Sequence, residues 1–232
     1  MRRIARRFRF ALLALLAVAV WSCEDHTGPG GVTARFALAP TFASSSAGIV
    51  DIDSVRVRLF RADETLALDT VVAVEADAES VALDLRVVIS STDEVFQMYL
   101  EFITPTGETA FTGGPVEVSP SSDDAEPVVI DVEVVYVGVG ADAASVEITT
   151  TGASVLFGDT VQLTAVARDS AGDAIPGTPV AWLSLDTARA AVPDAAVGAV
   201  VGVAERGSAR IAATLLTGPA DSASVLVQPV PS

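Results

Sequence analysis

The chain has 232 residues, 50% of them hydrophobic, and its 30 acidic and 14 basic side chains give a formal net charge of −16. This acidity excludes the cationic face that nucleic-acid binding needs. The single cysteine excludes an intrachain disulfide, and one cysteine with one histidine is too few for a zinc site built from these residues.

Residues 1–22 have the organisation of a bacterial signal peptide. A basic head comes first, and the apolar run 10–20 follows it. This run is shorter than the roughly 20 residues that a membrane-spanning helix needs, so it suits the hydrophobic region of a signal peptide. We therefore expect residues 1–22 to be removed. The basic head consists of Arg2, Arg3, Arg6, Arg7 and Arg9.

Residues 20–23, Val-Trp-Ser-Cys, resemble the lipobox of bacterial lipoproteins. The resemblance implies that Cys23 carries a diacylglycerol and that the mature chain is tied to a membrane outside the cytoplasm, in the periplasm or at the cell surface. Trp21 departs from the pattern, which usually has a small residue there. The alternatives are an ordinary secretion signal or an uncleaved anchor. After cleavage at Cys23 the formal net charge becomes −21, because the signal removes five arginines and no acid.

Residues 23–33 are interpreted as a lipidated tether. The segment contains several glycines and a proline and shows no regular period. Its histidine, His26, is the only one in the chain and is interpreted as incidental. Its position excludes a Ser-His-Asp triad inside either of the domains that follow.

Residues 34–138 are predicted to form the first domain, a β-sandwich of Ig-like or transthyretin-like type. Hydrophobic and mostly polar residues alternate with the period of two that is typical of strands. Shorter strands are predicted at residues 35–38, 70–74, 81–89 and 109–111, with turns at 63–64, 105–107, 113–115 and 120–122. The inward-facing sets are Val55, Val57 and Leu59; Phe96, Met98, Leu100 and Phe102; and Val128, Ile130, Val132, Val134 and Tyr136.

Two pairs of acids in this domain each share one strand face, and two carboxylates are all that a glycosidase requires. We favour a solvated face instead, with Asp131 and Glu133 opposite Arg56 and Arg58 on a neighbouring strand. The two acidic pairs are Asp51 with Asp53 and Asp131 with Glu133.

Calcium is a separate option, because its oxygen ligands often come from clustered acids. The candidates are Asp51 with Asp53, and the loop that holds Asp123, Asp124 and Glu126. The full spacing of an EF-hand loop is missing, so we predict no metal site and no cofactor.

Residues 138–142 are predicted to be the domain boundary, and residues 142–230 the second domain. From residue 145 to residue 228 the sequence resembles the bacterial Ig-like group 2 family, the domain type of invasin- and intimin-like surface proteins. The resemblance rests on residues 158–165, 169–173, 180–184, 201–204 and 207–214. It implies an antiparallel β-sandwich. Leu185 departs from the pattern, and so does the loose segment 190–198.

The residues of the second domain support the same fold directly. Val180 and Trp182 lie on one strand face, which predicts that the indole fills the space between two sheets; an exposed platform for stacking sugars is the alternative. Gly172 permits a tight turn with positive φ. The other inward-facing set is Val161, Leu163, Ala165 and Ala167.

The sequence thus predicts an all-β protein with two Ig-like antiparallel β-sandwich domains in tandem after a signal peptide. We expect a non-catalytic cell-envelope lipoprotein that acts as a binding, adhesion or spacer module. Its expected partners are a membrane, through the lipid on Cys23, and an envelope protein or polysaccharide. The alternative is a carboxylate-dependent enzyme acting on polysaccharide, or an accessory carbohydrate-binding subunit that uses the acidic first domain.

Overall fold

The computed structural model describes residues 32–33, 37–41, 48–74, 85, 87–89, 94–119 and 129–231. These residues form strands and turns and no helix, so the predicted all-β fold class is confirmed. The signal peptide, Cys23 and His26 lie outside the described residues, as does the acidic loop at 123–126.

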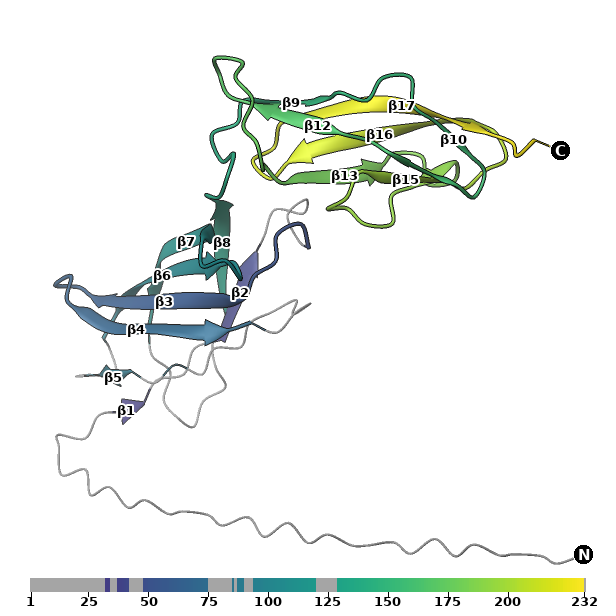
Figure 1. Ribbon diagram of the computed structural model, residues 1–232. Helices are drawn as coiled ribbons and strands as arrows, with labels where there is room; N and C mark the ends of the chain where they lie inside the picture. Colours follow the sequence, from purple (N-terminus) through teal and green to yellow (C-terminus); the bar gives the residue numbers. More distant parts are fainter. Residues whose placement is uncertain are drawn as a thin grey trace, which may run out of the picture. The chain divides into compact units, whose positions relative to one another are not determined.

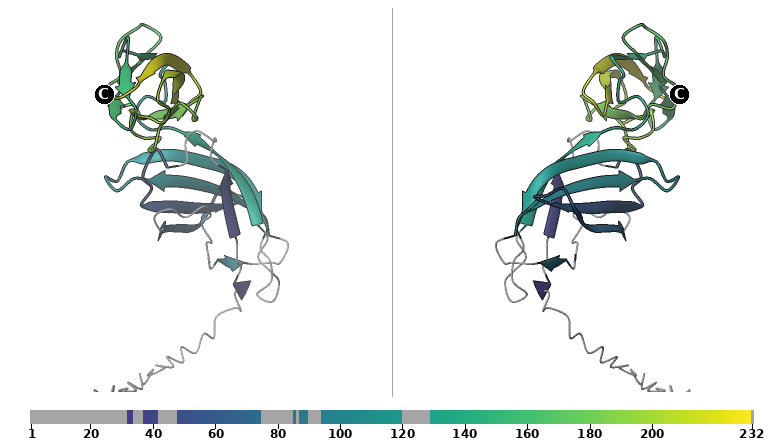
Figure 2. Two further views of the ribbon diagram at one scale, coloured as in Figure 1. Left: turned by 90° about the vertical axis from the view of Figure 1, so that its right-hand side faces the viewer. Right: turned by 90° about the vertical axis from the view of Figure 1, so that its left-hand side faces the viewer.

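The first half is built on one six-stranded sheet in the order β2-β8-β7-β6-β3-β4 (Figures 1 and 2). All its neighbouring strands are antiparallel except β2 and β8, which run parallel. A short antiparallel pair, β1 with β5, forms separately. The strands are β1 (Val32–Thr33), β2 (Ala37–Thr41), β3 (Ser54–Arg61), β4 (Leu66–Ala73), β5 (Val88–Ile89), β6 (Phe96–Ile103), β7 (Thr109–Val118) and β8 (Val129–Tyr136).

Alternation along β3 and β6 produces the core of this half. Val55, Val57 and Leu59 are buried on one face of β3, while the arginines between them are only half-buried. The apolar face predicted for β6 is also buried, from Phe96 to Phe102. Residues 85, 87 and 89 contribute three further buried apolar side chains to the same core. The predicted inward faces of β3 and β6 are therefore confirmed.

The predicted turn at residues 113–115 is wrong, because these residues lie inside β7. The pairing between β6 and β7 shifts between Met98 and Leu100, and Gly114 has φ 92° there. A Cβ on Gly114 would lie 2.3 Å from the Met98 carbonyl oxygen, so only glycine fits this bulge. Pro115, joined by a cis peptide bond, is tolerated because β8 pairs with β7 only as far as Gly113.

Other predicted boundaries differ from the structure by a few residues. β4 begins at Leu66, before the predicted start at residue 70, and β2 spans Ala37–Thr41 instead of residues 35–38. The turns at 63–64 and 105–107 are confirmed: Arg61 N–H donates to the Thr65 carbonyl across the first, and Thr104 N–H donates to the Glu108 carbonyl across the second.

The second half is a two-layered sandwich (Figure 1). One layer is the sheet β10-β17-β16-β13, in which β10 and β17 are parallel. The other consists of β11-β15-β14 and the pair β12-β9. The strands are β9 (Ser145–Ile148), β10 (Ser154–Leu156), β11 (Thr160–Gln162), β12 (Ala165–Arg168), β13 (Val180–Ser184), β14 (Ala190–Ala191), β15 (Ala199–Gly202), β16 (Gly207–Leu215) and β17 (Ala220–Gln228).

Trp182 lies in the core of this sandwich. Its residue surface is only 6% exposed, and it belongs to the same buried cluster as Leu163, Val200 and Ile211. The predicted core position of Trp182 is therefore confirmed, and its ring is no exposed platform. Gly172 has φ 90°, as its predicted turn requires.

Leu59→Ala and Leu66→Ala should separate core from surface in the first half. Leu59 is 0% exposed and Leu66 is 52% exposed. We expect Leu59→Ala to lower the free energy of unfolding by about 2–5 kcal/mol, since it leaves a cavity. Leu66→Ala should change it by no more than about 0.5 kcal/mol. Urea unfolding followed by circular dichroism measures both; equal losses would contradict the burial of the β3 face.

Trp182→Ala should lower the free energy of unfolding by about 3–5 kcal/mol, because the space between the two layers would lose its largest side chain. Differential scanning calorimetry measures the loss as a fall in Tm. An unchanged Tm would show that the indole does not hold the layers together.

Candidate functional site

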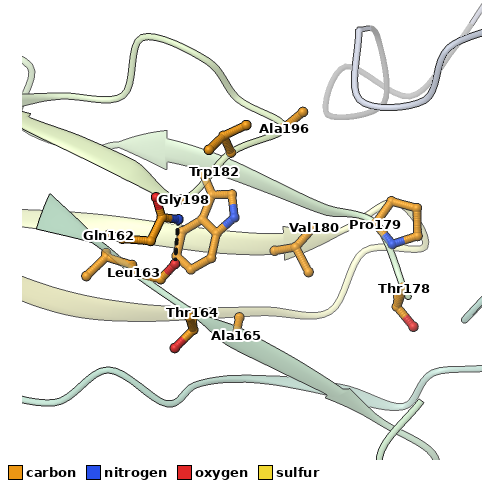
Figure 3. Close-up of a pocket in the computed structure, with 11 residues that line it drawn as sticks. Gln162, Leu163, Thr164, Ala165, Thr178, Pro179, Val180, Trp182, Ala196 and Gly198 are labelled. Atoms are coloured by element: carbon orange, nitrogen blue, oxygen red, sulfur yellow. Dashed lines mark hydrogen bonds between the residues drawn. The ribbon is translucent and has the colours of Figure 1, made fainter. Parts of the chain in front are cut away.

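A groove of about 350 Å³ opens on the side of the second-half sandwich (Figure 3). Its lining residues come from the junction of β11 and β12, from β13 with the segment before it, and from the loop that precedes β15. They are Gln162, Leu163, Thr164, Ala165, Thr178, Pro179, Val180, Trp182, Ala196, Val197 and Gly198. None of these side chains is ionisable, so the groove can bind uncharged groups but has no acid or base of its own.

The loop before β15 forms one wall of the groove because it lies very close to Leu163 and Trp182. Leu163 N–H donates to the Gly198 carbonyl (2.7 Å), and a Cβ on Gly198 would lie 2.5 Å from the Leu163 carbonyl oxygen and 2.9 Å from Cε2 of Trp182. Only glycine permits this approach. The backbone at Gly198 therefore lies against the indole ring.

The indole nitrogen of Trp182 is one of the polar side-chain groups of the groove lining, with those of Gln162, Thr164 and Thr178. Figure 3 shows it on the edge of the ring turned toward Val180, and no hydrogen bond to it is found within the described residues. In that part of the chain the only fully enclosed side-chain polar atom without a partner is Arg58 Nε. The unpartnered indole N–H is therefore reached by solvent through the groove.

One side of the groove is an unpaired stretch of the β12 edge. Thr164 directs its carbonyl toward β9, where Thr149 N–H donates to it (2.9 Å). Because alternate residues of a strand direct their backbone groups to the same side, Leu163, Ala165 and Ala167 face the other way. Leu163 N–H donates to the Gly198 carbonyl, and the Ala167 carbonyl accepts from Ile175 N–H (2.9 Å). Ala165, between them, has no partner among the described residues for its N–H or carbonyl.

The opposite side is the outer edge of β13. The backbone N–H and carbonyl groups of Ala181 and Leu183 point toward β16. This follows because Leu185, two residues further along, donates its N–H to the Arg210 carbonyl (2.9 Å). Trp182 N–H points outward and donates to the Ala195 carbonyl (2.8 Å). The backbone groups of Val180 also point outward, and no described residue pairs with its N–H or carbonyl. Two strand edges thus present unpaired backbone groups to one groove.

Two acids of the first half, Asp69 and Glu101, are held by arginines. Arg56 holds Asp69 of β4 through two hydrogen bonds of 2.8 and 2.7 Å, and Arg58 holds Glu101 of β6 at 2.5 Å. The Arg56 hydrogen bonds lower the pKa of Asp69. The prediction that Asp131 and Glu133 lie opposite these arginines is wrong, because β8 pairs with β2 and β7 and not with β3.

The predicted acidic pairs are not brought together into a site. Asp51 and Asp53 are exposed just before β3 rather than within a strand, and Asp131 and Glu133 are exposed along β8. No group of three or more His, Cys, Asp or Glu side chains lies close enough to hold a metal ion in the described ranges. None of the described segments forms an apolar helix of membrane-spanning length.

Tyr136 is the buried titratable side chain of β8. Its hydroxyl donates to the Val139 carbonyl (2.9 Å), and its ring meets Phe111 edge-on at 5.3 Å between centroids. Burial raises the pKa of Tyr136, and the negative charge of Glu108 adds to the rise. The residue therefore favours the neutral phenol in the folded protein.

Comparison with known proteins gives structural neighbours only. No protein-family pattern and no curated protein matches the chain. A fragment of the S-layer protein SbsC, domains 4 and 5, is 16% identical with a TM-score of 0.32 and covers 74% of this chain and 99% of its own. Mouse cadherin-23 EC22–24 is 11% identical with a TM-score of 0.31, and the match covers 87% of this chain and 67% of the cadherin fragment. The chain spans 27% of a longer SbsC fragment (18% identical, TM-score 0.29, 75% of this chain).

Tyr136→Phe should remove a pH-dependent part of the stability. Because the pKa of Tyr136 is raised on folding, its contribution is fully present below the unfolded value of about 10 and is lost as the pH rises through the folded value. The wild type should exceed the variant by about 0.5–1.5 kcal/mol at neutral pH through the lost hydrogen bond. Urea unfolding should show this gap narrowing above about pH 10. A constant gap would contradict the raised pKa.

Proposed function

We propose that the protein is a non-catalytic cell-envelope lipoprotein, tied to a membrane through Cys23, whose Ig-like β-sandwiches bind an envelope partner. The observation that carries the binding role is the groove beside Trp182. It offers unpaired backbone groups and one unpartnered indole N–H, and its lining has no ionisable side chain. Such a surface is suited to holding a ligand by hydrogen bonds and not to acid–base chemistry.

The distribution of acids supports binding over hydrolysis. A glycosidase needs two carboxylates on either side of a cleft, one of them kept protonated by its surroundings. Here Asp69 and Glu101 are held by arginines. The hydrogen bond from Arg56 lowers the pKa of Asp69, which favours its ionised form over the protonated form that a general acid needs. Asp69 and Glu101 thus form ion pairs, and the acids of the two predicted pairs are exposed to solvent.

The lipid anchor rests on the sequence. The apolar run at residues 10–20, followed by Val-Trp-Ser-Cys, is typical of a lipoprotein signal, and glycines follow within the tether. Burial of about 0.8 kcal/mol per methylene makes a diacylated cysteine an adequate anchor once a third acyl chain is added. We assign residues 145–228 to the bacterial Ig-like group 2 type on the motifs quoted above.

Cys23→Ala tests the anchor. Cells that express the wild type and grow with an alkyne analogue of palmitate should incorporate it into this protein and retain the protein in the membrane fraction. The variant should lose nearly all labelling, because the acceptor sulfur is gone, and should leave the membrane fraction or remain as uncleaved precursor. In-gel fluorescence and fractionation measure both. Equal labelling of the two proteins would refute lipidation at Cys23.

A further inference from the structure

We propose that the groove beside Trp182 binds a short extended peptide segment, uncharged where it crosses the groove and basic on either side. The segment would hydrogen-bond to the strand edges at Ala165 and Val180. This inference rests on the proposed role as a binding module and specifies its partner as a polypeptide.

The missing hydrogen bonds define the chemistry of the ligand. On the β12 edge, Leu163 N–H donates to Gly198 before Ala165, and the Ala167 carbonyl accepts from Ile175 after it, while Ala165 itself has no backbone partner on this side. On the β13 edge, pairing with Ala195 at Trp182 stops before Val180. An extended chain supplies alternating N–H and carbonyl groups in the spacing that such edges accept. The gap is short, so a few residues of peptide would fill it.

Trp182 adds a donor at the base of the groove. Its indole N–H has no acceptor among the described residues, although the side chain is more than nine-tenths buried. Solvent reaches this N–H, so water can accept from it in the free protein. A peptide carbonyl entering the groove would replace that water as the acceptor.

The charge of the surroundings selects the flanks of the peptide. A charged side chain inside the groove would find no counter-charge, because every lining residue is uncharged. The second half, residues 141–232, has nine acids and four arginines, so basic residues beside the inserted segment would be attracted to it. A second copy of this acidic chain would be repelled.

A sugar is the less suitable ligand. Polysaccharide sites commonly stack a sugar ring on an open aromatic face, whereas the backbone at Gly198 lies against the indole and leaves the residue 6% exposed. The polar side chains of the lining, Gln162, Thr164 and Thr178, already hydrogen-bond within the protein. The groups that remain are the edge of the ring and the strand backbones, which can hydrogen-bond to a peptide.

Trp182 is also the reporter for the experiment. The chain has two tryptophans, so the full chain with Trp21→Phe contains only Trp182. In detergent micelles with 15N-labelled tryptophan it should give one indole N–H signal. The probe is a synthetic peptide of alternating valine and threonine with two lysines at each end. The control peptide has the same side chains, and every central amide is N-methylated.

We expect the probe to move the indole signal downfield in a saturable way at concentrations up to about 1 mM. The N-methylated control should not, because it cannot donate to a strand edge. Ala196→Phe should weaken binding by about tenfold or more by filling the groove. Ala171→Phe is the matched control, since Ala171 and Ala196 are both exposed and both donate their N–H to the side chain of an aspartate two residues earlier.

Three outcomes would overturn the proposal: no shift with the probe, equal shifts with both peptides, or a shift with chitohexaose and none with the probe. Equal weakening by the two phenylalanine variants would also overturn it, since binding would then lie outside the groove. The palmitate labelling of Cys23 is independent of all four. Labelling of Cys23 with no peptide binding would refute this inference and leave the lipoprotein assignment standing. Peptide binding without labelling would refute the lipoprotein assignment and leave this inference standing.

Discussion

Burial of every second side chain is the constraint on which this structure depends. Without a disulfide, and with no helix in the described residues, each half is held by apolar strand faces pressed against other apolar side chains. Valine is frequent on the faces of both halves, alanine is frequent in the second half only, and β-branched valine packs well on a pleated surface. Trp182 is the one aromatic residue in the buried cluster of the second half, and the groove opens beside it.

The parts of the fold that depend on local alternation were predictable from the sequence. The inward faces of β3 and β6 and the core position of Trp182 follow from a period of two, which each strand carries within itself. β7 was not predictable in the same way. Gly-Gly-Pro normally marks a turn, and it is accommodated inside a strand here because the pairing of β7 with β8 stops at Gly113.

The site depended on pairings between distant segments, which no single stretch of sequence reveals. Arg56 and Arg58 were assigned to the wrong acids because strand order within a sheet is not a local property. The groove was missed for a related reason. The groove exists because the chain before β15 pairs with Leu163 and the chain at Ile175 pairs with Ala167, so neither segment reaches Ala165 between them. The only signal in the sequence was a tryptophan with no polar neighbour to accept its N–H.

The paired arginines of β3 have a further consequence. Arg56 stands directly opposite Glu101 yet bonds most closely to Asp69, and Arg58 stands opposite Asp69 yet bonds to Glu101. Hydrophobic alternation penalises slippage of a strand by one residue, but slippage by two keeps the same alternate side chains on the core face and carries no such penalty. The crossed bonds discriminate against one direction of that second error, because sliding β4 until Asp69 lies opposite Phe60 would take Asp69 away from Arg56. These ion pairs thereby favour the observed alignment over one that the apolar face alone would not distinguish.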